Sequence, residues 1–157
     1  MHPLVVVAPD IRSAHNVGSI FRTADSAGLQ HVYLCGFTPT PQHRGVIKTA
    51  LGAQEAVPWT HTPEALPLLA QLRADGYTLA ALEITDSAIA PEAIGAEHLP
   101  LALILGNEVH GVPPEVLEMV DLHLALPQYG VKASLNVSVA FGIAAYALVG
   151  RMREFAT

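Results

Sequence analysis

The stretch LPQYGVKASLNVSVA (residues 126–140) is a polar loop that runs directly into a long apolar segment of helical character. Ser134 and Asn136 are residue types that begin helices, because their side chains accept hydrogen bonds from free backbone N–H groups. A polar loop between a short strand and a helix N-terminus is also where α/β proteins bind small ligands. The stretch therefore predicts either an ordinary capped helix or one wall of a ligand site.

Short apolar runs alternate with helical periodicity along the whole chain. We expect strands over 4–8, 31–36, 57–60, 77–83, 101–105 and 123–126, and helices over 16–27, 48–53, 63–75, 113–120 and 134–154. This alternation predicts an α/β fold, a mostly parallel sheet flanked by helices. No repeat or linker divides residues 1–157, so we expect a single domain.

The final predicted helix is apolar nearly all round, which is typical of a helix covered on more than one side. One side is expected to face the sheet, and a second subunit is a candidate for the other. The apolar run over 135–149 contains Asn136, Ser138 and Gly142, and it is shorter than the 18 or more apolar residues that a membrane span needs. We therefore interpret it as a buried helix, with no membrane partner.

The composition limits the function classes. A net charge of −6 argues against a generic nucleic-acid binder, because phosphate neutralisation needs Lys and Arg. However, Arg12, Arg22, Arg44, Lys48 and Lys132 fall in or beside the segments that look functional, which allows an RNA partner at a defined site. The chain has a single cysteine, Cys35, which excludes an intrachain disulfide and fits a reducing cytoplasm. The apolar run at the N-terminus is not preceded by basic residues, so we do not expect a signal peptide.

The first candidate motif is NVGSIFRTAD (residues 16–25). Asn16 could cap the predicted helix, and Gly18 allows close approach of another chain or a ligand. Arg22 precedes Asp25 by three residues, so an ordinary surface ion pair is one interpretation. The alternative is a guanidinium that binds a phosphate or ribose oxygen.

The second candidate motif is LGNEVHG (residues 105–111), which follows a strand and precedes a helix that begins at proline. Gly106 and Gly111 permit tight backbone geometry, and Glu108 could orient a ligand hydroxyl or an arginine. A turn with solvated polar residues is the alternative. The eight histidines are dispersed without zinc-ligand spacing, and no Gly-rich phosphate loop occurs, so no metal site is expected.

In this order, the three stretches closely resemble the motifs of the SpoU (TrmH-like) class of the SPOUT superfamily of RNA methyltransferases. The matching segments are NVG with RTAD, GNE, and SLNVSVA, and KTALGA (residues 48–53) followed by VPW also resembles compact members of the class. One departure is Val109, followed by His110, where the family usually has glycine after Asn-Glu. A second is the acidic composition without an added RNA-binding domain.

The resemblance implies a C-terminal deep trefoil knot, a homodimer, and methylation of a ribose 2′-hydroxyl in tRNA or rRNA. It also implies S-adenosyl-L-methionine as the methyl donor. By position, the cofactor-binding residues would be Leu82, Glu83, Leu105, Gly106, Leu126, Ser134 and Leu135, and the catalytic residues would be Arg22, Asn16, Glu108 and Asn136.

The chemistry of the implied reaction supports a role for Arg22. A ribose hydroxyl is a weak nucleophile at neutral pH and needs a base or a positive charge beside the developing alkoxide. An arginine is almost always protonated, so we favour charge stabilisation and phosphate contact over general-base catalysis. Asn16, Glu108 and Asn136 would then orient Arg22 and the RNA.

Two other functions stay open from the sequence. The first is a non-catalytic RNA-binding or assembly module that retains the knotted fold, and the second is a small-ligand α/β protein such as a nucleotide-binding regulator. The sequence does not identify the RNA, the nucleotide position or the base.

Overall fold

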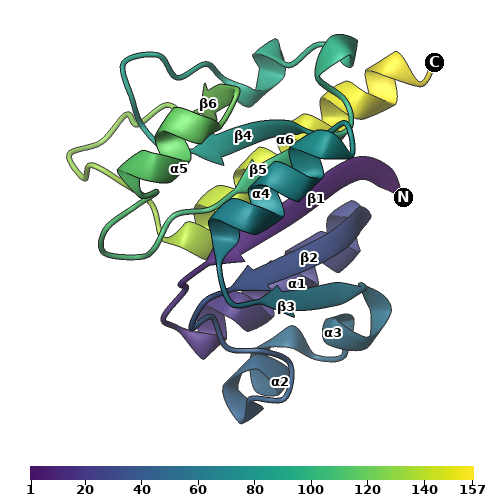
Figure 1. The fold of residues 1–157 in the computed structure, drawn as a ribbon, viewed down its shortest axis with the longest axis vertical. Coiled ribbons are helices and arrows are strands. Elements are labelled where there is room, and N and C mark those ends of the chain that lie inside the picture. The colour runs from purple at the N-terminus through teal and green to yellow at the C-terminus, as the bar shows by residue number, and fades with distance from the viewer.

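A computed structural model describes all residues, 1–157. Its six strands form one sheet, and every neighbouring pair is parallel. The strands are β1 (His2–Pro9), β2 (Leu29–Cys35), β3 (Trp59–Thr62), β4 (Thr78–Leu82), β5 (Leu101–Ile104) and β6 (Leu122–Leu124). Their order across the sheet is β3-β2-β1-β5-β4-β6 (Figure 1). Because all strands run in the same direction, the loops after them meet at one edge of the sheet.

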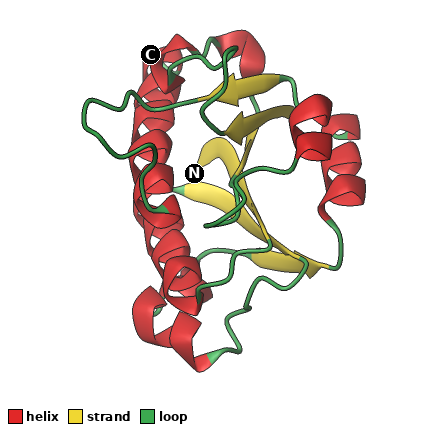
Figure 2. Ribbon diagram, turned by 90° about the vertical axis from the view of Figure 1, so that its left-hand side faces the viewer, coloured by secondary structure: helices red, strands yellow, loops and turns green.

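Helices cover both faces of the sheet, as Figure 2 shows. They are α1 (Ala14–Ala27), α2 (Arg44–Ala50), α3 (Ala53–Ala56), α4 (Ala65–Ala74), α5 (Pro114–Met119) and α6 (Val137–Phe155). Two short 3₁₀ helices, η1 (Pro91–Ala93) and η2 (Ala96–His98), precede β5. The prediction of a mostly parallel sheet flanked by helices is confirmed.

The central strand β1 separates two apolar clusters. Leu4, Val6 and Ala8 point to the side where α1 and α6 pack, whereas Val5 and Val7 point to the side of α4 and α5. Successive side chains of a strand alternate between faces, so a run of apolar residues indicates a strand that is buried on both. Cys35 at the end of β2 is 1% exposed, and burial raises the pKa of its thiol.

Helix α1 begins one turn earlier than the expected cap at Asn16. Ser13 is the cap, and its side chain accepts a hydrogen bond from the backbone N–H of Asn16. Asn16 itself lies in the helix with its side chain buried. Gly28 ends the helix with a φ of 76°, a left-handed conformation that glycine adopts without steric cost.

The expected helix over 48–53 is instead two short helices with a break inside that range. Leu51 and Gly52 both have positive φ, at 52° and 93°, and this reversal ends α2 and starts α3. Helical spacing of apolar residues did not reveal the break, because Leu51 has no intrinsic preference for that conformation.

Helix α6 starts at Val137, and Asn136 caps it by accepting from the N–H groups of Ser138 and Val139. Ser134, the other expected cap, stays in the loop. Val139, Ile143 and Tyr146 are each about half exposed, so one side of this apolar helix has no cover within the chain. No helix of the chain is both long and apolar enough to cross a membrane. The trefoil knot that the resemblance implies stays a prediction.

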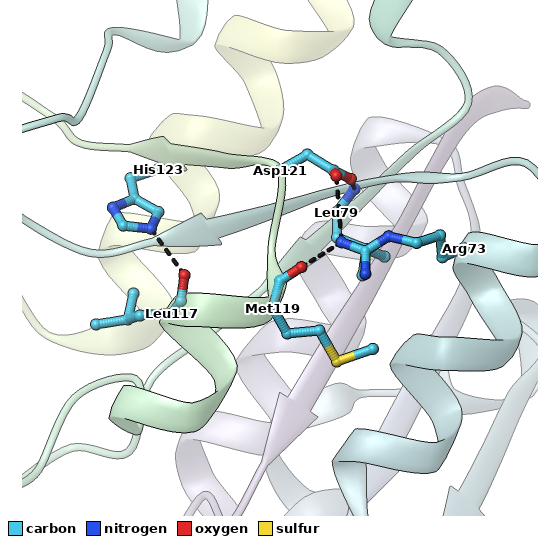
Figure 3. A network of polar contacts seen from close by, with 6 residues as sticks. All are labelled: Arg73, Leu79, Leu117, Met119, Asp121 and His123. Carbon is cyan, nitrogen blue, oxygen red and sulfur yellow. Dashed lines mark hydrogen bonds and ion pairs between the residues drawn. The ribbon is translucent and has the colours of Figure 1, made fainter.

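A polar network fixes the connection from α5 to β6 against α4 and β4 (Figure 3). Arg73 donates to the carbonyl of Met119 and to Asp121 Oδ1, and Asp121 Oδ2 accepts from the Leu79 N–H at 2.8 Å. His123 Nε2 faces the carbonyl oxygen of Leu117 at 3.1 Å. These contacts hold β4 and β6 in place, and the loops that follow both strands border the cavity described next.

Candidate active site

A cavity of about 530 Å³ lies where β4, β5 and β6 end and α6 begins. The carboxyl ends of parallel strands are where α/β proteins bind ligands, and the volume is in the usual range for small-molecule sites. All seven residues expected to bind the cofactor line it: Leu82, Glu83, Leu105, Gly106, Leu126, Ser134 and Leu135. The structure thus brings together three loops that are separated by tens of residues in the sequence.

Gly106 and Gly111 allow the backbone at the start of the 106–111 turn to lie against the backbone at its end, at one wall of the cavity. A Cβ built on Gly106 would lie 2.7 Å from the carbonyl carbon of Gly111 and 2.8 Å from the nitrogen of Val112. The side chain of Glu83 crosses to the same turn, where its Oε2 accepts from the Val112 N–H at 2.7 Å. The ends of β4 and β5 are therefore joined at one wall of the cavity.

Asn107 fixes the shape of the 106–111 turn. Its Nδ2 donates to the carbonyl oxygen of Asp10 at 2.7 Å, and its Oδ1 accepts from the N–H groups of Val109 and His110. The side chain of Asn107 is therefore bound within the protein and is not simply solvated. The side chains of Val109 and His110 consequently stand at the tip of the turn, beside the cavity.

Glu108 binds the segment that leads into α1. Its Oε1 accepts from the backbone N–H of Arg12 at 2.9 Å, and its Oε2 accepts from Ser13 N–H at 2.9 Å and Asn16 Nδ2 at 3.1 Å. Burial by itself raises the pKa of this carboxyl, but the donated hydrogen bonds outweigh burial and hold the pKa below its usual value. Glu108 is therefore ionised at neutral pH, at the N-terminal end of a helix that favours negative charge.

A chain of hydrogen bonds continues from Glu108 to the start of α6. Asn16, which is only 6% exposed, donates to Glu108 and accepts from Asn136 Nδ2 at 3.2 Å. Ser138 Oγ lies 2.7 Å from Asn136 Oδ1 and 3.4 Å from Asn16 Oδ1, so its single proton favours the shorter contact. We call Glu108, Asn16 and Asn136 the relay. It joins one residue from each of the three sequence motifs.

The depressed pKa of Glu108 predicts an acid-dependent contribution to stability. Above about pH 4.5, the usual pKa of this group, the wild-type protein should be more stable than Glu108→Gln. This difference in stability should disappear as the pH falls through the lower pKa of Glu108 in the folded protein. The melting temperatures of both proteins between pH 3 and pH 7 measure this difference. A difference that stays constant across the range would contradict the role assigned to the carboxylate.

Arg22 lies apart from the relay within one chain. It follows Asn16 by six residues, so it is roughly 9 Å further along the helix axis and on a different face. Arg22 is exposed, and neither a hydrogen bond nor an ion pair joins its side chain to another residue of the chain. The surface pair with Asp25 is absent. The expected contact of the relay with Arg22 is also not made inside the chain.

Sequence reasoning missed some residues that the structure places at the site. Ser13 could have been found as a helix cap, because a serine precedes the apolar periodicity that starts at Val17. Ser138 was visible only as part of a motif, without a role. Ile84, His110 and Gln128 also line the cavity. His110 and Gln128 lie within the quoted stretches but were given no role, and no local pattern in the sequence marks Ile84.

The model of the SpoU rRNA Methylase family matches residues 3–146, which contain the cavity and the complete relay. The chain belongs to the SpoU rRNA methylase family. The match leaves out only the end of α6 and the first two residues, so every element that positions the site lies within it.

Curated SpoU relatives cover most of this chain. The chain is 34% identical over 147 residues to the 23S rRNA (guanosine(2553)-2′-O)-methyltransferase of Bacillus subtilis, which covers 93% of the chain and 58% of that protein. It is 28% identical over 145 residues to a tRNA (guanosine(18)-2′-O)-methyltransferase of Aquifex aeolicus, covering 91% of the chain and 67% of that protein. The chain thus spans a little over half to two thirds of these relatives.

The SpoU fold is also found in solved structures. An AdoMet-bound rRNA methyltransferase from Sinorhizobium meliloti superposes with a TM-score of 0.86 at 28% identity. The match covers 94% of this chain and 57% of that one. The overall fold described above is therefore similar to that of this solved rRNA methyltransferase.

Proposed function

We propose that residues 1–157 form a SpoU-type methyltransferase domain that transfers a methyl group from S-adenosyl-L-methionine to a ribose 2′-hydroxyl of tRNA or rRNA. The relay carries this proposal, because it places one polar residue from each motif beside a cavity of suitable size. The named activities of the relatives, which are 2′-O-methylations of tRNA and rRNA, support the same reaction.

The cavity residues fit S-adenosyl-L-methionine. Leu82, Leu105, Leu126 and Leu135 offer apolar surface to an adenine ring, and Ser134 and backbone groups of the loop over 127–136 offer hydrogen-bond partners. The carboxylate of Glu83 has one oxygen, Oε1, without a partner in the chain, which suits a hydroxyl or ammonium donor. When bound, the molecule supplies an electrophilic methyl group on its sulfonium sulfur.

The protein's contribution to the reaction is positioning and charge. The relay fixes the N-terminus of α1 against that of α6, which sets the place where a ribose would lie beside the cavity. The guanidinium of Arg22 would stabilise the negative charge that develops on the 2′-oxygen and hold the neighbouring phosphate. Because Arg22 points outward within one chain, we propose that it serves the cavity of a second subunit.

The exposed side of α6 supports a homodimer. Val139, Ile143 and Tyr146 are spaced at helical intervals, and each is about half exposed. Tyr146 Oη lies 2.5 Å from Ser26 Oγ of α1, so this side of α6 adjoins the helix that carries Arg22. A second copy that covers the surface would remove its apolar side chains from water and bring two Arg22 side chains to the interface.

Changing the α6 surface is expected to separate the subunits. Ile143→Glu should convert a particle of twice 16.6 kDa into one of 16.6 kDa, because a carboxylate at an apolar interface loses its hydration without a partner. Sedimentation velocity measures the mass. Leu66→Glu, at an apolar residue of similar exposure on α4, is the control and should leave the mass unchanged. A wild-type monomer would contradict the dimer.

The experiment that tests the function uses methyl-labelled S-adenosyl-L-methionine and bulk RNA from cells that lack the protein. Label in a 2′-O-methyl nucleoside after digestion is the expected result, and its base and RNA fraction would identify the target. We place the reaction in the cytoplasm. Label in a methylated base would overturn the ribose chemistry. RNA binding without any label would instead favour a non-catalytic RNA-binding module.

A further inference from the structure

The charges of this acidic protein are unevenly distributed. Residues 1–54 contain four basic and two acidic side chains, whereas residues 55–121 contain one basic and eleven acidic side chains. The first segment forms β1, α1, β2 and α2, at one half of the sheet. Salt screens charges over about 8–10 Å, so acidic side chains farther than this from α1 and α2 contribute little to the potential there; Glu108, which is bound at the start of α1, is an exception.

The cations of this basic half are unpaired. Elsewhere in the chain, Arg73 pairs with Asp121 at 3.1 Å and Arg151 pairs with Glu154 at 2.6 Å. The side chains of Arg12, Arg22, Arg44 and Lys48 are exposed, and none has a carboxylate partner in the chain. Their charges are therefore available to an external anion.

Packing of α2 on α1 brings these cations together. A Cβ built on Gly45 would lie 2.8 Å from the Cβ of Ala14, and Thr49 Oγ1 donates to the carbonyl oxygen of His15 at 3.2 Å. Gly45 and Thr49 therefore face the first turn of α1, and Arg44 and Lys48, each one residue earlier, lie along the exposed flank beside that contact. Figure 1 shows α2 at the bottom of the molecule, below β3.

This flank is next to the proposed active site. The first turn of α1, which contacts α2, comes immediately after Arg12 and Ser13 in the sequence. The N–H groups of these two residues donate to Glu108 of the relay. On α1, Arg22 lies one turn after Gly18, which contacts Thr49 of α2. Cations on both helices thus border the contact between α1 and α2, and Arg12, which precedes α1, is the one next to the relay.

We propose that this surface, formed by Arg44 and Lys48 of α2 together with Arg12 and Arg22, binds the phosphate backbone of the RNA substrate. RNA carries a negative charge at each phosphate, and basic side chains bind it by releasing condensed counterions. Ile47 and Leu51 of α2, which are 46% and 69% exposed, offer apolar contact to sugars and bases next to the charges. The surface gives an acidic protein a local binding site and directs a ribose toward the cavity. This inference rests on the proposed function.

The test measures binding of unfractionated tRNA and of rRNA as a function of salt, for wild type and Arg44→Ala/Lys48→Ala. We expect the double variant to bind the substrate fraction about tenfold more weakly near 0.15 M salt, and the salt slope to fall by about 1.5, as loss of two phosphate contacts requires. S-adenosyl-L-methionine affinity should be unchanged, because neither Arg44 nor Lys48 lines the cavity. Arg153→Ala, which removes an exposed charge near the far end of α6, is the matched control and should leave RNA binding unchanged.

Three outcomes would overturn the proposal. Wild-type affinity and salt slope in the double variant would show that RNA binds elsewhere, while the methyltransferase function would stand. A parallel loss of S-adenosyl-L-methionine affinity would show that α2 acts through the fold of α1. Wild-type protein that binds neither RNA fraction would overturn the surface together with the proposed function.

Discussion

Arg22→Ala is expected to lower the rate of methyl transfer by about 10²–10³-fold while leaving S-adenosyl-L-methionine binding intact, because removal of one preorganised donor to a developing oxyanion has an effect of this size. Arg22 does not line the cavity, so binding of the methyl donor should not depend on it. Single-turnover methylation and calorimetric titration of the donor measure the two quantities separately.

Two further variants make the Arg22 result specific. Asp25→Ala changes an exposed charge one turn away on the same helix, and it should retain full activity because Asp25 does not pair with Arg22. Arg22→Lys keeps the charge but loses the planar fork, so it should recover only part of the rate. Full activity of Arg22→Ala would refute the role proposed for this residue.

Gly106→Ala should produce the second large effect, loss of the cofactor site. The new Cβ would meet backbone atoms of Gly111 and Val112 at 2.7 to 2.9 Å, and backbone cannot move aside as a flexible side chain can. We expect a loss of about 1–3 kcal/mol in the free energy of unfolding, as for other overpacked sites, and loss of detectable donor binding. Denaturant unfolding and calorimetry measure these changes.

A loop that borders the cavity offers a matched control for the Gly106 prediction. Gly130 lies in the loop that joins β6 to α6, and a Cβ built on it meets nothing within 4 Å. Gly130→Ala should therefore preserve both stability and donor binding. If Gly106→Ala behaved like Gly130→Ala, the close approach at this turn would not be required for the site.

Much of the fold could be predicted from the sequence, because buried apolar residues recur with the fixed periods of helices and strands. The uninterrupted apolar run of β1 indicates a strand that is buried on both faces, and the structure has apolar clusters on both of its sides. Local backbone reversals were not readable in the same way. The break between α2 and α3 occurs at Leu51, whose positive φ is imposed by its surroundings and not by its residue type.

For the site, the sequence supplied candidates and the fold decided their contacts. Glu108 and Asn16 are 92 residues apart, and Asn136 and Asn16 are 120 residues apart, yet each pair is hydrogen-bonded. No local pattern encodes such contacts, because they depend on how the ends of parallel strands meet. Family resemblance supplied the grouping that spacing alone could not.

The sequence by itself determined the fold class, the family and the polar residues of the three motifs, because these depend on residue types at short spacings. Only the tertiary structure decided that Glu108, Asn16 and Asn136 form one relay and that Arg22 faces away from it. The helix period turns Arg22 to a different face from Asn16, and the close packing of α2 and α6 on α1 leaves that face exposed. The position of a charged side chain relative to a cavity is set by this packing, which joins segments that are distant in the chain.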